Sequence, residues 1–210
     1  QPVAASKLTG KYGGFDIGVL SAVDNQDASF NQTNSPLYNI VRLQRDLGAQ
    51  SRMGIAYTDK IDGQRWNRVV GVDGRLVRGI YNLQGQVASS FTSSDTGMRR
   101  APLFDVSASR NGRRFVARYA MSGISPDFDA QSGFIARPGI ANISATHRWN
   151  FYGKPKALVE LFSPELYMLG RYQYDSFVNG DGSQDRQLHL RANTRLKRGW
   201  QIGTQLLLEV

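Results

Sequence analysis

The last part of the sequence, from Arg186 to Val210, constrains the fold more than any other stretch. Apolar and polar side chains alternate through it on both sides of a predicted tight turn at Arg198-Gly199. The apolar positions are Leu188, Leu190, Ala192, Thr194, Leu196, Ile202, Thr204, Leu206 and Leu208. Because successive side chains of a strand point to opposite faces, this pattern predicts two strands with one apolar and one charged face. Two such strands of about ten residues are the repeating unit of a transmembrane β-barrel.

The composition of the 210-residue chain excludes several classes of protein. No run approaches the ~18 apolar residues that a transmembrane helix requires. A barrel is compatible with the mean hydropathy of -0.39, because alternation hides its apolar face from such averages. The absence of cysteine excludes disulfides and metals held by thiolates.

The formal net charge of +9 suggests acidic partners. However, Lys and Arg recur singly within the predicted strands, and neither a basic run nor a nucleic-acid-binding motif is present. We therefore expect no nucleic-acid partner.

Turn signals divide the rest of the chain into similar hairpins. Short turns are predicted at Gly13-Gly14, Gly48-Ala49, Gly79, Asn111-Gly112, Gly153 and Arg198-Gly199. Long polar loops are predicted over 24–36, 59–66, 92–100, 124–139 and 178–185. The stretch 156–177 is expected to be extended, with a bulge or an edge at Pro164, which cannot donate a ladder hydrogen bond.

Two features favour an outer-membrane barrel over a soluble sandwich, which also has repeated strands. Short turns alternate with long loops, and the strands are about ten residues long, against ~5–6 in soluble proteins. Aromatic residues near the predicted strand ends fit an interfacial girdle, although aromatics are common in strands generally. These residues are Tyr81, Phe91, Trp149, Tyr174, Phe177 and Trp200.

Three segments resemble the β-barrel part of a bacterial outer-membrane family of uncharacterised function. They are KLTGKYGGFDIGVLSAVDNQ (7–26), LYNIVRLQRDLGAQSRMGIAYTDK (37–60) and ISPDFDAQSGFIARPG (124–139). The specific matches are Lys-Leu-Thr-Gly-Lys before Gly-Gly, and the loop from Asp127-Phe128 to Gly133-Phe134-Ile135-Ala136-Arg137. The resemblance implies an outer-membrane location and a barrel fold, and it assigns no reaction. A carbohydrate-binding-module-like domain commonly precedes the barrel in that family, and it is absent from these residues.

The predicted fold is therefore an all-β, antiparallel, up-and-down transmembrane β-barrel of about twelve strands. We expect residues 1–5 to be a tail or linker end and residues 6–210 to form the barrel. Outer-membrane barrels usually finish on an aromatic residue, whereas this sequence ends Leu208-Glu209-Val210. About twelve strands can close a barrel on their own. The missing aromatic end favours instead an ordered portion of a longer chain, whose strands would belong to a larger barrel.

Catalysis and metal binding have little support in the sequence. His189 lies on a predicted polar face and His147 shares alternation with Trp149, and no serine stands out as a partner for either. The loop 178–185 offers Asn179, Asp181, Ser183 and Asp185 at every second position, a weak calcium candidate that lacks the glycine and distal glutamate of an EF-hand. We therefore expect that the protein is not an enzyme and binds no cofactor. We also expect that the loop 178–185 is a solvated surface loop.

The polar face of the predicted strands is the more informative set, because in a barrel it lines the lumen. The candidate lining residues are Arg42, Gln44, Gln84, Gln86, Arg114, Arg118, Arg171, Gln173, His189, Arg191, Arg195 and Lys197. Rings of Arg and Lys favour anions, although any lumen must be polar.

We predict an outer-membrane pore or membrane anchor suited to anionic or sugar-like solutes. The alternatives are a non-conducting subunit of an envelope complex and a soluble β-protein that binds an acidic ligand. The expected partner is outer-membrane lipid, with other envelope proteins and surface polysaccharide as further candidates.

Overall fold

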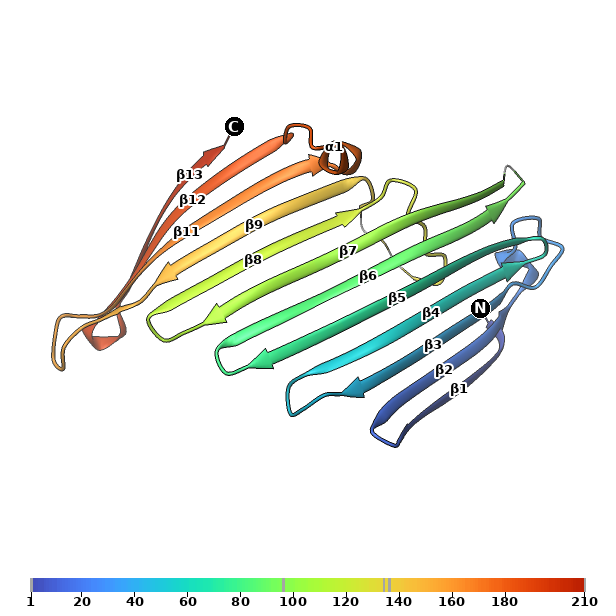
Figure 1. Ribbon diagram of the computed structural model, residues 1–210, viewed down its shortest axis with the longest axis horizontal. Coiled ribbons are helices and arrows are strands. Elements are labelled where there is room, and N and C mark those ends of the chain that lie inside the picture. The colour runs from blue at the N-terminus through green and yellow to red at the C-terminus, as the bar shows by residue number, and fades with distance from the viewer. Residues whose placement is uncertain (1, 96, 134, 136, 210) are drawn as a thin grey trace. The chain divides into compact units, whose positions relative to one another are not determined.

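The computed structural model describes residues 2–95, 97–133, 135 and 137–209, and it consists almost entirely of β-strands (Figure 1). The strands of the first part are β1 (Pro2–Tyr12), β2 (Phe15–Asp24), β3 (Leu37–Asp46), β4 (Arg52–Asp62), β5 (Arg65–Arg78), β6 (Tyr81–Ser94) and β7 (Gly97–Asn111). They are followed by β8 (Phe115–Ile124), β9 (Ile140–Trp149), β10 (Phe151–Tyr152), β11 (Val159–Gln173), β12 (Asp185–Leu196) and β13 (Gln201–Glu209). The helical segments are η1 (Gln26–Ala28), α1 (Tyr174–Asn179) and η2 (Lys197–Gly199).

The strands form one sheet in which chain order is also spatial order. The path runs β1-β2-β3-β4-β5-β6-β7-β8-β9-β11-β12-β13, and the two-residue β10 pairs with β11 beside this path (Figure 1). The predicted all-β, sequential antiparallel arrangement is confirmed, with twelve strands on the path. Within the described residues the sheet is not closed, and β1 and β13 are its two ends.

The chain divides into two compact units. Unit 1 comprises residues 1–76, 84–104 and 124–139, and unit 2 comprises 77–83, 105–123 and 140–210. No helix in the described part of the chain is both long and apolar enough to cross a membrane.

In unit 1 the register gathers aliphatic side chains on one face. Ile17 pairs with Leu43, Leu43 with Ile55, and Ile55 with Val72. The alternate positions place Arg42 opposite Ala56 and Gln44 opposite Gly54, on the other face. The side chains of Ile17, Ile55 and Val72 are exposed, so the apolar face of unit 1 is uncovered.

Unit 2 repeats this division with the C-terminal hairpin. Leu190 pairs with Leu206, and Leu188 pairs with Leu208. Leu190, Leu206 and Leu208 are 42%, 53% and 49% exposed, so these leucines do not point into a closed core.

Buried hydrophobic residues are few in both units. Among the described residues they are Ala101, Ala117, Phe128 and Ala141. Since three of these four are alanines, neither unit encloses a hydrophobic core of ordinary size.

Three predicted boundaries are wrong because the strand ladder continues into segments that were predicted to leave it. Residues 2–5, predicted as a tail, belong to β1. The predicted loop 59–66 is a tight turn at Gly63-Gln64, because the pairing continues through Asp59↔Arg68 to Asp62↔Arg65. The predicted loop 92–100 is largely strand, since β6 reaches Ser94 and β7 starts at Gly97. Long loops are confirmed between β2 and β3 and between β8 and β9, so the alternation of loop lengths is only partial.

The region 156–177 also differs from its prediction. Only Val159–Gln173 is extended, and the chain then turns into α1, which ends at Gly180 with φ +80°. Pro164 lies where the partner strand changes: β9 pairs with β11 up to Arg148↔Glu165, and β10 resumes at Phe151↔Phe162. The missing N–H of proline explains why the ladder breaks there.

A few sequence predictions fall outside the described residues. These concern Gln1 in the predicted tail, Thr96 in the predicted loop 92–100, Phe134 and Ala136 in the resemblance motif, and the terminal Val210.

Candidate functional site

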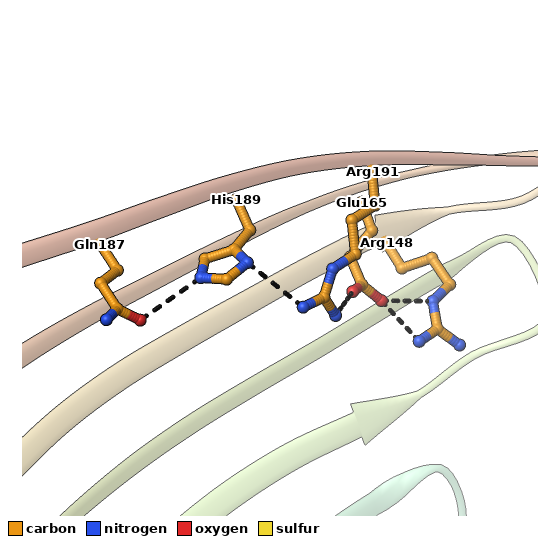
Figure 2. Close-up of polar contacts among 5 residues, drawn as sticks. All are labelled: Arg148, Glu165, Gln187, His189 and Arg191. Atoms are coloured by element: carbon orange, nitrogen blue, oxygen red, sulfur yellow. Dashed lines mark hydrogen bonds and ion pairs between the residues drawn. The ribbon is translucent and has the colours of Figure 1, made fainter. Parts of the chain in front are cut away.

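The main candidate site is a charged cluster on the polar face of unit 2. The register places Glu165 of β11 between Arg148 of β9 and Arg191 of β12. Arg148 Nε and Nη2 donate to Glu165 Oε2 at 2.8 and 2.5 Å, and Arg191 Nη1 donates to Oε1 at 3.4 Å (Figure 2). Only 8% of the Glu165 side chain is exposed, so two guanidinium groups neutralise one buried carboxylate.

The cluster continues along β12 through His189 and Gln187. Arg191 Nη2 lies 3.3 Å from His189 Nδ1, and His189 Nε2 lies 3.4 Å from Gln187 Oε1 (Figure 2). Since guanidinium nitrogens only donate, Nδ1 accepts and the imidazole proton is on Nε2. The ring of Tyr167 packs edge-on against His189, with centroids 5.2 Å apart, and Arg191 lies 5.9 Å from the Tyr167 centroid. Gln187, His189 and Arg191 therefore form one row held by both strands.

The electrostatics of this row favour anions. Arg148 and Arg191 carry two positive charges against the one of Glu165, and each guanidinium has five N–H donors. Arg191 Nε is buried and has no hydrogen-bond partner. The side chains of Arg148 and Arg191 are 48% and 38% exposed, so their other N–H groups keep donor capacity that carboxylate, phosphate or sugar oxygens can use.

The other predicted lining residues of unit 2 are spread more widely. Arg171 lies 3.6 Å from Asp185, and Arg195 lies 3.3 Å from Glu160. Gln173 is exposed at the end of β11, where it precedes α1. Lys197 was predicted on the strand but belongs to the η2 turn, because β12 ends at Leu196.

The two candidate lining residues near β8 also lie apart from the charged cluster. Arg118 is exposed in β8 and points away from the apolar face, because Phe115 and Tyr119 contact His147 on that face. Arg114 was predicted on the strand but precedes β8, and its carbonyl accepts the Asn150 N–H at 2.8 Å. The strand starts one residue later because the Asn111-Gly112 turn extends through Arg114.

In unit 1 the polar face centres on Arg42. Its Nη2 donates to Asp73 Oδ1 at 2.7 Å, Nη1 bonds the second carboxylate oxygen, and Gln44 Oε1 lies 3.4 Å from Nη2. A Cβ on Gly54 would lie 2.8 Å from Arg42 Nη2, so a glycine there leaves room for the guanidinium.

Gln84 and Gln86 share this face of unit 1. A Cβ on Gly71 would lie 3.2 Å from the Cβ of Ala88, and Gly71 pairs with Ala56 opposite Arg42. Since alternate residues share a face, the two glutamines of β6 lie on the polar side, as predicted.

Loop residues are anchored on the same polar face of unit 1. The fully buried Asn67 donates from Nδ2 to the Asp129 carbonyl at 3.1 Å and accepts the Gln131 N–H at 3.0 Å. The Ser90 hydroxyl accepts the Asp129 N–H at 3.2 Å, and Phe128 is buried beside it in the chain. The described part of loop 125–139 is therefore bound to the sheet by buried polar groups.

The loop between β2 and β3 is anchored in a similar way. Asp62 accepts the Phe30 N–H and the Ser29 hydroxyl, both at 2.7 Å. Arg65 lies over the Phe30 ring, with its guanidinium carbon 3.3 Å from the centroid.

The weak calcium candidate is not assembled as a cation site. Asn179 ends α1, the Ser183 hydroxyl accepts from Arg186 Nε at 2.6 Å, and Asp185 faces Arg171. The Asp181 N–H donates to the Ser176 carbonyl. No group of three His, Asp or Glu side chains that could hold a metal occurs in the described ranges.

His147 lies in an aromatic group on the apolar face of unit 2. Its Nε2 is 2.7 Å from the Tyr119 hydroxyl, and its ring lies 6.0 and 6.1 Å from those of Phe115 and Trp149. The predicted alternation with Trp149 is thus confirmed. A serine nucleophile is not among the contacts of either histidine in the described residues.

The sequence analysis missed the acidic partners. Glu165 has the same alternation as Arg171, so continuing that row six residues back through Leu169 and Tyr167 would have found it. Asp73 could not be found this way, because its contact with Arg42 depends on the pairing of three strands. No family model, no curated protein and no solved structure matches this chain.

Proposed function

We propose that the chain is an outer-membrane β-barrel whose polar face lines a basic lumen, and that it acts as a pore or membrane anchor for anionic or sugar-like solutes. The observation that carries this proposal is the uncovered apolar face. In both units the aliphatic face is exposed, while the opposite face holds ion pairs such as Arg42 with Asp73 and Arg148 with Glu165.

The energetics favour lipid as the medium of the aliphatic face. Exposed apolar surface costs roughly 25 cal/mol per Å² in water, so rows such as Ile17, Ile55 and Val72 would be strongly unfavourable there. A bilayer removes this cost, and an antiparallel sheet is one of the two architectures that can span it, provided that its edges are paired. The soluble alternative would require a second layer over this face.

Strand number supports closure of the sheet into a barrel. Twelve strands lie on the path, so β1 and β13 run in opposite directions and can pair as neighbouring strands of an up-and-down barrel. Both strands are exposed along their described lengths. Long unpaired edges promote aggregation, and pairing β1 with β13 would remove both.

The resemblance described above points to the same location. Its quoted segments cover residues 7–12 of β1, all of β2 and β3, most of β4 and the β8–β9 loop, and the resemblance implies an outer-membrane location. Surface polysaccharide and other envelope proteins are proposed as further partners on this ground.

A second candidate function, a non-conducting anchor or scaffold, is favoured by the anchored loops of unit 1. Asn67, Ser90 and Asp62 bind loop backbone onto the polar face, where it would narrow a lumen. Closure would then serve stability more than transport.

Cysteine cross-linking tests closure, because the chain contains no cysteine of its own. Leu8→Cys on β1 is combined in turn with Ile202→Cys, Thr204→Cys and Leu206→Cys on β13. A disulfide requires Cα atoms within about 7 Å, so one pair should oxidise quantitatively in vesicles if the edges meet. Leu8→Cys with Val72→Cys, on the same face but four strands further along, is the matched control and should stay reduced.

Insertion and conductance are measured on the same refolded protein. The barrel should show heat-modifiable electrophoretic mobility after refolding into vesicles, whereas a detergent-free, soluble monomer would overturn the membrane proposal. Channel openings in planar bilayers would support the pore, and a fully inserted protein without openings would leave the anchor as the function.

A further inference from the structure

The short-turn end of unit 2 collects positive charge from three separate turns. Its cations are Arg113, Arg114, Lys154, Lys156, Lys197 and Arg198, which together are called the basic end below. All six are exposed. They are scattered over 86 positions of sequence, from 113 to 198, which is why no basic run is visible in the sequence.

Hydrogen bonds to backbone carbonyls hold the three turns together. The Asn150 N–H donates to the Arg114 carbonyl at 2.8 Å, and Asn150 Nδ2 donates to the Arg113 carbonyl at 3.0 Å. The Lys197 N–H donates to the Leu158 carbonyl at 3.0 Å. The first bonds join the turn before β8 to the start of the β10 turn, and the last joins the end of that turn to η2.

No acidic residue offsets these cations within the turns. The segments 110–115, 150–158 and 196–200 contain neither Asp nor Glu. At the opposite end of unit 2, the segment 174–186 carries Asp175, Asp181 and Asp185 against one arginine, Arg186. Unit 2 is therefore polarised along its strands.

Exposed aromatic side chains accompany the basic end. Trp200 is 71% exposed and Phe151 57%, and the ring of Phe151 stacks on Phe162 with centroids 6.2 Å apart. The guanidinium of Arg113 lies 4.8 Å from the centroid of Tyr152. Cations beside exposed Trp, Tyr and Phe are the side chains that occupy the boundary between acyl chains and headgroups.

Lys11, at the short-turn end of unit 1, has a different environment. Lys11 donates to Asp46 at 2.9 Å and lies 3.4 Å from Asp16, so a carboxylate pair already neutralises it. The cations of the unit 2 turns are therefore available to an anionic group outside the described chain.

We propose that the basic end is a binding site for the phosphate-bearing headgroups of anionic phospholipids in the leaflet that meets the short turns. The inference rests on the proposed barrel, since the headgroups must lie at the rim of the apolar face. Anionic lipid attracts basic residues at the membrane surface over about one Debye length, ~10 Å in 0.1 M salt. The aromatic side chains would fix the depth of the rim, and the cations would select the lipid charge.

The test compares lipid selectivity in protein refolded into neutral phosphatidylcholine vesicles. Spin-labelled phosphatidylglycerol and spin-labelled phosphatidylcholine are added separately, and electron spin resonance gives the fraction of each that contacts the protein. The wild type should prefer phosphatidylglycerol by severalfold, and about 0.5 M salt should reduce this preference by screening.

A triple variant, Lys154→Gln with Lys156→Gln and Lys197→Gln, should lower the preference close to one. The matched control, Lys7→Gln with Arg99→Gln and Arg100→Gln, also removes three exposed positive charges and should keep it. A wild-type preference of one, as an acidic protein partner would give, overturns the site. An equal loss in both variants also overturns it, because net charge would then explain the selectivity.

Heat-modifiable mobility in the neutral vesicles reports insertion independently of lipid charge, so failure of the barrel is recognised separately. If the chain does not insert, flotation with phosphatidylglycerol vesicles replaces the resonance measurement. Flotation of the wild type and control, but not of the triple variant, would support the basic end. Equal flotation of all three would overturn it.

Discussion

The polar faces of the two units carry similar residues but use them differently. In unit 1 buried polar side chains such as Asn67 and Ser90 bind loop backbone, and the Arg42 and Asp73 pair lies on the same face. In unit 2 the most buried charged group, Glu165, forms ion pairs with two arginines of the neighbouring strands. The polar face of unit 1 is stabilised by the loops that cover it. The polar face of unit 2 is stabilised by ion pairs between neighbouring strands of the sheet.

This difference predicts how each unit responds to mutation. A buried carboxylate between two cations is costly to remove, because the cations lose their only nearby negative charge. A buried amide that binds a loop mainly holds that loop, so its loss should release a local segment.

Glu165→Gln should have the largest effect. Arg148 and Arg191 would face each other without the carboxylate, and we expect the free energy of unfolding to fall by about 2–3 kcal/mol. Urea unfolding followed by tryptophan fluorescence measures the change. Glu160→Gln is the control: its side chain is 44% exposed against 8% for Glu165, and the loss should stay below about 0.5 kcal/mol. Equal losses would contradict the buried cluster.

Asn67→Ala should release the loop of unit 1. The Asp129 carbonyl and the Gln131 N–H would lose their partner, at a cost of about 2 kcal/mol. Chymotrypsin should then cut after Phe128, which is buried in the native protein. The exposed Asn193→Ala provides the comparison, and a resistant Phe128 site in Asn67→Ala would argue against the anchor.

Asp73→Asn should have a smaller effect. The side chains of Arg42 and Asp73 are 36% and 31% exposed, so water partly screens the pair, and a loss of about 1 kcal/mol is expected. The measurement is the urea midpoint of the variant beside that of Asp105→Asn, an exposed carboxylate of β7. A midpoint equal to the Asp105→Asn value would mean that the Arg42 pair contributes nothing.

The smallest effect should be the pH dependence of the Arg65 and Asp95 pair at the turn after β6. The side-chain hydrogen bond from Arg65 holds the pKa of Asp95 below its ordinary value of 3.8. A lowered folded pKa stabilises the protein above the unfolded pKa, and this contribution is lost as pH falls through the folded pKa. Unfolding midpoints of wild type and Asp95→Asn should therefore differ at pH 7, and the difference should disappear as pH falls through the lowered folded pKa of Asp95. A difference that persists at acid pH would implicate another group.

Much of the strand pattern could be predicted from the sequence. Alternation at Leu188, Leu190, Leu206 and Leu208 identified a face that the structure leaves exposed, and the Asn111-Gly112 signal identified a real turn. Boundaries failed where polar residues stay in the ladder. Asp59 and Arg68 pair across strands, and no local rule distinguishes such a pair from two loop residues.

The sequence predicted which residues of the candidate site lie on the polar face, but it did not predict which of them form ion pairs. Arg191 and His189 were predicted because alternation placed them on the polar side. Glu165, which directly follows Pro164, was not predicted. Arg114 and Lys197 were predicted singly, but the basic end was not predicted as a group, because its residues become neighbours only when three turns are hydrogen bonded to one another.

The sequence by itself therefore determined that this chain builds antiparallel strands with one aliphatic and one charged face. That property is local, since the two-residue period of a strand assigns every side chain to a face. Tertiary contacts set which charges meet, which loops bind the polar face, and where cations lie without a carboxylate partner among the described residues. Those properties depend on strand register, and register brings together residues that lie far apart along the chain.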